Sequence, residues 1–127
     1  MLTTDVCVPV SRLAECIVET KNDLANFSFP ATMVGHVGDG NFHVLCMIDP
    51  NNPVELQEAE RFSDRTVRRA LRMSGTSTGE HGIGIGKTKY LAGEHGHALA
   101  VMRVIKKSLD PDNRLNPGKM IDLHDKG

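Results

Sequence analysis

The sequence predicts an α+β fold, in which an antiparallel sheet carries helices on one face. Two apolar segments, residues 31–37 and 41–48, flank the pair Asp39-Gly40 and so predict a β-hairpin. An amphipathic helix is predicted before this hairpin and a longer one after it. The resulting order of strand, helix, strand, strand and helix is that of a partial ferredoxin-like layer, followed by a C-terminal helix. The fourth strand of a complete layer is not evident.

The residues before the hairpin predict one strand and one helix. Residues 4–10, with the sequence TDVCVPV, predict the first strand, and Pro9 marks its end. Ser11 is a candidate N-cap for a helix that runs to about residues 22–25. The face of this helix that we expect to be buried comprises Leu13, Ile17, Thr20 and Leu24.

The strongest helix signal follows the hairpin. Asn52 is the predicted N-cap, Pro53 occupies the first helical position, and Glu55 completes a capping box. Gly75 is the expected C′ residue. The apolar stripe comprises Ala59, Phe62, Thr66, Ala70 and Met73. The arginines off this stripe predict an exposed basic face, with contact to an anionic surface as the alternative: Arg65, Arg68, Arg69 and Arg72.

The C-terminal part predicts one further helix and a turn. Residues 93–109 show helical spacing, and Asp110-Pro111 ends the helix. The face that we expect to be buried comprises Ala98, Met102, Ile105 and Leu109. Asp110 and Asp112 resemble the start of a calcium loop, but Arg114 stands where an acid or amide is required. Calcium is therefore not predicted.

The composition narrows the classes of function. A chain of 127 residues suffices for one domain with a substantial core. Nearly balanced charge, with 15 Lys+Arg and 16 Asp+Glu, and the absence of Trp argue against a nucleic-acid partner. The odd cysteine count predicts free thiols in a reducing compartment: Cys7, Cys16 and Cys46. No apolar run approaches the roughly 20 residues of a membrane span. We expect a soluble, cytoplasmic protein, mitochondrial if eukaryotic, without peripheral membrane contact.

The hairpin brings two histidines together. If Asp39 and Gly40 form a two-residue turn, His36 lies directly opposite His43. A four-residue loop gives the same register, whereas a one-residue slip would place the rings on opposite faces. Directly opposed Cβ atoms lie about 4.5–5.5 Å apart, so two imidazoles can converge on one ion. The hairpin therefore predicts half of a metal site.

A second unusual segment, residues 75–87, contains five glycines. It fails as a phosphate-binding loop, because the Walker A pattern requires glycine where His81 stands, and a dinucleotide fingerprint from Gly84 requires glycine where Lys89 stands. Its adjacent Glu80 and His81 offer a carboxylate ligand and a proton acceptor.

His36, His43 and Glu80 together form a set of two histidines and one carboxylate, which leaves coordination positions for substrate. Zinc, manganese and iron all tolerate this set, and we expect zinc or manganese. Asp39 is predicted as a turn residue and Asn41 as the start of a strand. Two further histidines near a helix start, His95 and His97, are predicted to lie at the surface.

Three motifs, in this order, closely resemble the C-terminal part of FAD-linked D-lactate dehydrogenases, which are flavoenzymes of the vanillyl-alcohol-oxidase type. They are the segments 36–43 (HVGDGNFH), 79–84 (GEHGIG) and 110–119, which includes Asn-Pro-Gly-Lys. The resemblance extends over essentially the whole chain. It implies that residues 1–127 are the substrate- and metal-binding C-terminal part of a longer flavoenzyme, whose N-terminal FAD-binding domain has no counterpart here.

The resemblance also assigns roles to individual residues. It implies that His36, His43 and Glu80 bind a divalent metal, that His81 accepts the proton of the substrate hydroxyl, and that Asn116 approaches the flavin. The resemblance implies oxidation of a small D-2-hydroxy acid, with FAD as the hydride acceptor. Position 45 is Asn in the hydroxyglutarate branch of the family but Leu45 here, which favours a smaller acid such as lactate. The isolated chain is then expected to be inactive.

A different class of function is compatible with the same residues. The chain would then be a non-catalytic module that binds metal or dimerises, with a purely structural glycine-rich segment. In either case an exposed edge strand or apolar patch predicts self-association, for example as a homodimer.

Overall fold

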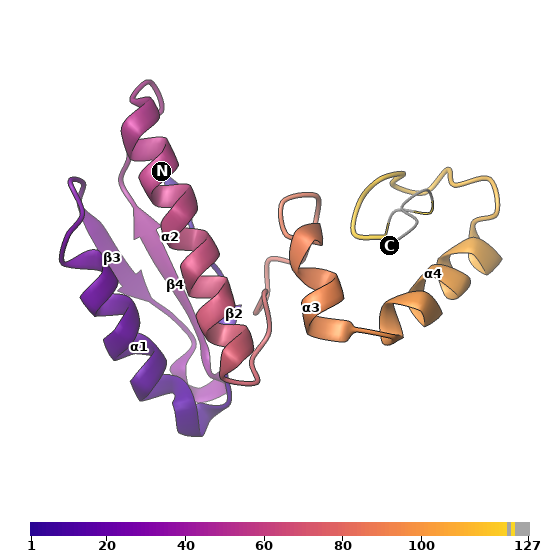
Figure 1. The fold of residues 1–127 in the computed structure, drawn as a ribbon, viewed down its shortest axis with the longest axis horizontal. Coiled ribbons are helices and arrows are strands. Elements are labelled where there is room, and N and C mark those ends of the chain that lie inside the picture. Colours follow the sequence, from indigo (N-terminus) through magenta and orange to yellow (C-terminus); the bar gives the residue numbers. More distant parts are fainter. Residues whose placement is uncertain (122, 124–127) are drawn as a thin grey trace. The chain divides into compact units, whose positions relative to one another are not determined.

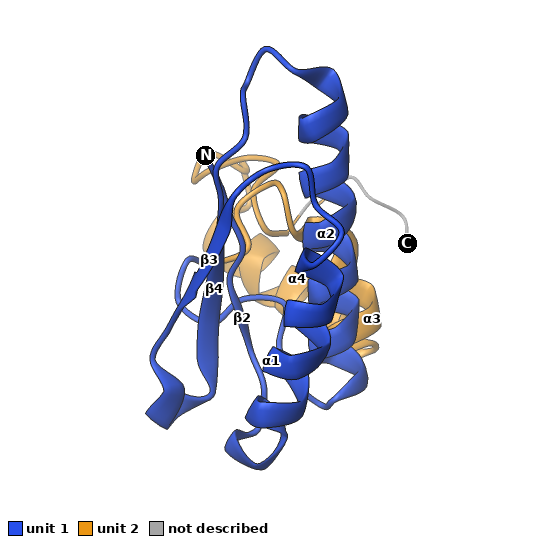
Figure 2. Cartoon of the chain, turned by 90° about the vertical axis from the view of Figure 1, so that its left-hand side faces the viewer, with its two compact units in different colours: residues 1–81 blue, residues 82–127 orange. Residues whose placement is uncertain are grey.

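The computed structural model of the protein describes residues 1–121 and 123. It divides into two compact units, residues 1–81 and residues 82–127 (Figure 2). Each is considered separately below. The single domain expected from the length stays a prediction. Among the described residues, no helix has both the length and the apolar character needed to cross a bilayer.

The first unit contains an antiparallel sheet with two helices on one face, which confirms the predicted α+β class (Figure 1). Its elements, in chain order, are β1 (Leu2–Thr3), β2 (Val6–Cys7), α1 (Val10–Leu24), β3 (Ala31–Val34), the 3₁₀ turn η1 (Val37–Asp39), β4 (Asn41–Cys46) and α2 (Pro53–Arg72). Both predicted helices and both hairpin strands are therefore present, and their order confirms the partial ferredoxin-like layer.

The N-terminal strand differs from the prediction. It lies at residues 2–7 rather than 4–10, and it is interrupted between β1 and β2. The interruption arises at Thr4, whose hydroxyl oxygen accepts the N–H of Val44 at 2.9 Å. Ser11 is not the N-cap, because α1 begins one residue earlier and Pro9 occupies the cap position without a side-chain hydrogen bond.

Both parts of the N-terminal strand pair with the same edge of β4. Leu2 lies opposite Cys46 and Val6 opposite Phe42, so the two pairings share one register. On the far side of this strand, Cys7 makes an isolated antiparallel bridge to Thr76, directly after α2. This bridge stands where a ferredoxin-like layer has its fourth strand. The fourth strand is thus reduced to a single bridge.

The hairpin register also differs from the prediction. Val34, not His36, lies opposite His43. Asp39 belongs to η1 and does not have a positive φ, so neither the two-residue turn nor the four-residue loop forms. Gly40 alone in this connection has a left-handed φ, 76°, and a Cβ there would lie 2.0 Å from the carbonyl oxygen of Val8.

The wider connection is closed by hydrogen bonds within itself. The carbonyl oxygen of His36 accepts the N–H groups of Asp39 and Asn41, at 2.9 and 3.3 Å. The observed register is two residues away from the predicted one. Because side chains alternate with a period of two, His36 and His43 remain on the same face.

β4 divides its side chains between the two faces of the sheet. Phe42, Val44 and Cys46 are at most 2% exposed and form the core with α1 and α2. The alternate residues Asn41, His43 and Leu45 lie on the opposite face, which these helices do not cover. We call this the open face. The residues that the two helices contribute to this core are Leu13, Cys16, Thr20, Ala59, Phe62, Thr66, Val67 and Ala70.

The predicted N-cap of α2 is confirmed, but its capping box is not, because the Glu55 carboxylate accepts the N–H of Asp49 and the side-chain NH₂ of Asn52 instead of the backbone N–H of Asn52. The side-chain oxygen of Asn52 accepts the N–H groups of Val54 and Glu55, and Pro53 is the first helical residue. The C-terminal prediction was wrong by one position. Ser74 adopts the left-handed conformation, with φ 60°, and the N–H of Gly75 donates to the carbonyl of Ala70 at 2.8 Å. The helix therefore ends in a Schellman motif with serine at C′.

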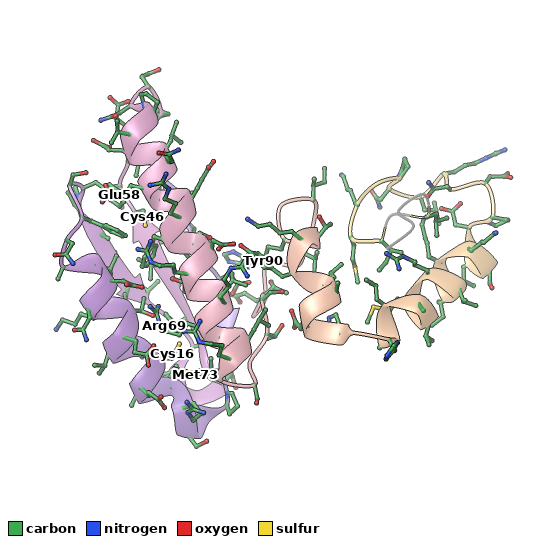
Figure 3. The ribbon with its side chains drawn as sticks, in the orientation of Figure 1. Cys16, Cys46, Glu58, Arg69, Met73 and Tyr90 are labelled. Atoms are coloured by element: carbon green, nitrogen blue, oxygen red, sulfur yellow. The ribbon has the colours of Figure 1, made fainter. Side chains whose placement is uncertain are left out.

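One member of the predicted basic face is buried. Arg69 is 6% exposed and lies between α1 and α2, close to Cys16 (Figure 3). Its guanidinium donates to Glu19 at 3.0 Å, to the hydroxyl of Thr20 at 3.0 Å, and to Asp23. The prediction of an exposed residue was wrong because α1 supplies acceptors that helical spacing within α2 does not reveal.

The second unit is built from shorter elements than predicted. These are the 3₁₀ turn η2 (Thr88–Tyr90), α3 (Leu91–His95) and α4 (Ala98–Leu109). The helix predicted over residues 93–109 is broken at Gly96, with φ 52° and ψ −126°. No residue of α4 is buried within the described chain, and Leu109 is 79% exposed. The predicted buried face is wrong, because α3 has only one buried residue and is too short to cover α4.

Asp110 ends α4 as predicted and organises the turn that follows. Its buried carboxylate accepts the N–H groups of Arg114 and Leu115, both at 2.8 Å, and the ammonium of Lys106. The hydrogen bond from Lys106 is the main reason that the pKa of Asp110 falls to about 2. This carboxylate therefore holds the turn that follows α4.

Candidate metal centre and active site

The open face of the first unit brings together His36, His43 and Glu80. One ligand atom from each lies within 4.8 Å of the other two. Glu80 Oε1 is 2.9 Å from His43 Nε2 and 3.8 Å from His36 Nε2. The sequence predicted this group, although from a hairpin register that is two residues off. Whether it binds a metal stays a prediction.

The surroundings of His43 orient its ring. Nδ1 lies 3.1 Å from the carbonyl oxygen of Thr4, which can accept a hydrogen bond but cannot donate one. The tautomer that satisfies this contact carries its hydrogen on Nδ1 and leaves a lone pair on Nε2, facing Glu80. Histidine ligands of metals are commonly held in this way, by a backbone carbonyl on the other nitrogen. The donor set and the tautomer therefore fit a divalent ion.

The three candidate ligands differ in exposure. The His43 side chain is 8% exposed, whereas those of His36 and Glu80 are 64% and 46% exposed. One ligand is thus fixed in the sheet and two approach from connections. The arrangement thus combines one buried candidate ligand, in β4, with two exposed candidate ligands.

His81 lies directly beside this group. Its ring stacks on that of His43, with centroids 4.9 Å apart and planes 10° from parallel. His81 Nε2 is 3.7 Å from Glu80 Oε1, and the side chain is half exposed. An imidazole in this position can exchange a proton with a molecule bound at the candidate ligands.

Asp5 is a member of the site that the sequence analysis did not predict. It is 1% exposed, and its Oδ1 lies 3.6 Å from His43 Nδ1. Its Oδ2 accepts the N–H groups of Gly79 and His81 at 2.9 and 3.0 Å. A single acidic residue in an apolar strand belongs to no motif that its spacing would reveal. The available clue was that a buried carboxylate needs donors, which a glycine-rich segment provides as backbone N–H groups.

A hollow of about 380 Å³ opens at these residues. Its apolar wall includes Val34 and Leu45. Its full lining comprises Thr3, Val34, Gly35, His36, His43, Leu45, Glu80 and His81. The histidines and Glu80 of this hollow therefore lie beside a small apolar surface, as polar groups do in many small-molecule sites.

Two asparagines complete the comparison with the predictions. Asn41 begins β4 as predicted, and its buried amide packs against Gly79, where a Cβ would lie 2.2 Å from Asn41 Nδ2. Asn116, predicted on the flavin side, lies in the second unit with an exposed residue surface and a left-handed φ of 48°. The side chain of Asn116 is thus available to a partner.

Known proteins identify the family of this chain. A family model described as "FAD linked oxidases, C-terminal domain" matches residues 1–120. The chain belongs to this family. The resemblance found in the three sequence motifs is thereby confirmed at the level of this family.

Similar proteins carry related names. "Probable D-lactate dehydrogenase, mitochondrial" of Danio rerio is 54% identical over 95% of this chain and 24% of that protein. "D-lactate dehydrogenase [cytochrome], mitochondrial" of Arabidopsis thaliana is 51% identical over 97% of this chain and 22% of that protein. A "D-2-hydroxyglutarate dehydrogenase" of Xanthomonas citri is 36% identical over 95% of this chain and 27% of that protein. The chain spans about a quarter of the length of these relatives.

Proposed function

We propose that this chain is the metal- and substrate-binding C-terminal part of an FAD-dependent D-2-hydroxy-acid dehydrogenase. The observation that carries the proposal is the convergence of His36, His43 and Glu80 on one hollow, with His81 stacked beside them. Family membership supports the same reaction class. The alternative, a module that binds metal without catalysis, gives no reason for the stacked His81.

The chain's own residues would divide the work as follows. His36, His43 and Glu80 hold a divalent ion, zinc or manganese, through two nitrogens and one carboxylate oxygen. When bound, the ion supplies positive charge that lowers the pKa of a substrate hydroxyl, and FAD supplies a hydride acceptor. His81 takes the hydroxyl proton at Nε2, next to the Glu80 carboxylate that stabilises the resulting imidazolium.

The proposed substrate is D-lactate. Val34 and Leu45 give the hollow an apolar wall, which suits a methyl group better than a second carboxylate. The relatives named as D-lactate dehydrogenases from Danio rerio and Arabidopsis thaliana are more similar to this chain than the one named as a D-2-hydroxyglutarate dehydrogenase. Both observations support a small 2-hydroxy acid.

The proposed partners lie outside the chain. FAD would be bound mainly by a flavin-binding domain like that of the longer relatives, with Asn116 contributing from the present chain. A mitochondrial location is proposed from the names of the relatives. Homodimerisation is proposed from the second edge of β3, for which the sheet pairing gives no partner strand within the described residues.

Metal content of the purified chain tests the proposal directly. After removal of bound metal and dialysis against Zn²⁺ or Mn²⁺, we expect about one equivalent in the wild type and strongly reduced binding in His36→Ala and Glu80→Ala. His97→Ala, which changes an exposed histidine of the second unit, is the matched control. Equally little metal in the wild type and both site variants would contradict a preformed site.

Activity provides the second test. The isolated chain should not oxidise D-lactate with a dye acceptor, because the hydride acceptor is proposed to be bound elsewhere. Robust turnover by this chain without an added flavoprotein would contradict the proposed division of the enzyme. Gel filtration over a range of concentrations tests self-association separately, and a monomer at every concentration would contradict it.

A further inference from the structure

The carboxylate of Asp5 is the most enclosed charged group next to the candidate metal site. It is 1% exposed, and it lies in the short interruption between β1 and β2. Burial of a carboxylate is unfavourable unless hydrogen bonds replace the lost water. The position of Asp5 is therefore maintained by its donors.

These donors come from four consecutive residues. Oδ2 of Asp5 accepts the hydroxyl of Thr78 at 2.7 Å and the N–H groups of Gly79, Glu80 and His81 at 2.9, 3.2 and 3.0 Å. Oδ1 is 3.4 Å from the N–H of Glu80. One carboxylate thus fixes the backbone of both the candidate ligand Glu80 and the candidate base His81.

The sheet places this carboxylate beside the third participant. Because β1 and β2 pair with β4 in one register, the residue of the interruption that falls opposite His43 is Asp5. The measured separation of 3.6 Å between Asp5 Oδ1 and His43 Nδ1 agrees with that placement. A segment more than 70 residues away in sequence is therefore docked onto the histidine of β4 through one side chain.

We propose that Asp5 is the positioning residue of the active site, which holds Glu80 and His81 in register with His43. The proposal rests on the proposed function, since it assigns Asp5 a role toward the metal ligands. Asp5 acts through the backbone N–H groups of residues 79–81 and the hydroxyl of Thr78. Its effect is to hold the backbone from which the Glu80 and His81 side chains extend beside His43.

An amide does not replace this carboxylate. In Asp5→Asn the NH₂ group stands either at Oδ2, where four donors converge, or at Oδ1, where it meets the N–H of Glu80 and Nδ1 of His43. In both orientations a donor faces donors. The substitution is isosteric, so it disturbs the hydrogen bonds while it leaves the packing volume unchanged.

The test is Zn²⁺ affinity of the purified chain, measured by competition with a chromophoric chelator. We expect Asp5→Asn to lower the affinity by about 10–100-fold, the range typical of residues that hold metal ligands in place. We also expect a changed visible absorption spectrum of the Co²⁺-substituted chain, because the coordination geometry is altered. Asp110→Asn, a change at a comparably buried carboxylate of the second unit, should leave both readouts at their wild-type values.

The outcomes separate this proposal from the proposed function. If the wild type and Asp5→Asn bind Zn²⁺ equally and give the same Co²⁺ spectrum, while Glu80→Ala loses binding, the role of Asp5 is refuted and the metal site stands. If the wild type itself does not bind Zn²⁺ or Co²⁺, the proposed function fails, and the role of Asp5 fails with it.

A measurement on the wild type covers the case in which Asp5→Asn does not fold. The amide protons of Gly79, Glu80 and His81 are expected to exchange with solvent at least about tenfold more slowly than in an unfolded chain, as followed by NMR. Protection of all three supports a segment held by Asp5. Exchange at unfolded-chain rates would overturn the proposal, whatever the behaviour of the variant.

Discussion

The two faces of the sheet in the first unit use the same strand for opposite purposes. On the helix-covered face, Phe42 and Val44 of β4 are buried among apolar side chains. On the open face, His43 of the same strand is surrounded by Asp5, Glu80 and His81. The comparison shows that alternation along one strand places core residues on one face and a candidate metal ligand on the other.

The two faces also differ in how burial is achieved. The covered face is enclosed by α1 and α2, whose apolar stripes are visible in the sequence. On the open face, residues 78–81 are held beside His43 by hydrogen bonds to Asp5. Changes to the two faces should therefore have separable effects on the free energy of unfolding and on metal binding.

The largest expected effect is on the covered face. Phe62→Ala removes a fully buried ring that packs edge-on against Phe27 at a centroid distance of 5.0 Å. We expect a loss of about 3–5 kcal/mol in the free energy of unfolding, measured by urea denaturation. Val54→Ala, at a highly exposed position on the same helix, should change it by less than about 0.5 kcal/mol. Similar values for the two variants would contradict the assignment of the core.

His43→Ala is the corresponding change on the open face. It should reduce Zn²⁺ affinity by more than the roughly 10–100-fold typical of residues that merely support a ligand. It also removes the group that contacts the Thr4 carbonyl, so we expect a loss of about 1–3 kcal/mol in stability, smaller than for Phe62→Ala. Calorimetric titration and urea denaturation measure the two effects. Undiminished Zn²⁺ binding would exclude His43 as a ligand.

Gly79→Ala tests the close approach on the open face. A Cβ at this position would lie 2.2 Å from Nδ2 of Asn41, so either the buried amide of Asn41 or the segment that carries Glu80 must shift. We expect weaker Zn²⁺ binding by about tenfold and a destabilisation of about 1–3 kcal/mol. Gly38→Ala is the matched control, because a Cβ there meets no atom within 4 Å. Equal behaviour of the two variants would show that this segment tolerates displacement.

The smallest expected effect is a difference in thiol reactivity between a cysteine of the covered face and one of the open face. Cys46 lies in the core, whereas Cys7 is partly accessible beside η1. Burial raises the pKa of both thiols, and in Cys7 the neighbouring Asp5 and Asp39 raise it further. We expect iodoacetamide to label Cys7 slowly at pH 7 and faster as rising pH forms the thiolate, while Cys46 reacts after unfolding. Mass spectrometry of labelled peptides checks this order, and equal labelling of both would refute it.

Local features of the sequence predicted local structure well. The cap residue Asn52 and the spacing of apolar residues located α2 almost to its last residue. These signals succeed because they depend on neighbours within one or two turns. The free cysteines and the α+β class were likewise predictable from composition and pattern.

Two of the errors arose where distant segments decide the structure, and one arose in the local geometry of a turn. Arg69 is buried because α1 supplies its acceptors, and the hairpin register is set by the wide connection around His36 rather than by an Asp-Gly turn. Asp5 was missed because its donors are mostly backbone N–H groups, which the identities of side chains do not display. The ligand group was nevertheless predicted, since an error of two residues in register preserves the face of a strand.

The connection between β3 and β4 gives the candidate site an adjustable part. His43 cannot move without moving Phe42 and Val44, whereas His36 lies in residues 35–40, outside both strands. Gly35 and Gly40 of this connection pack closely against the rest of the unit, whereas a Cβ at Gly38 would meet no atom within 4 Å. Changes around Gly38 would therefore displace the candidate ligand His36 while His43 and the core stay in place.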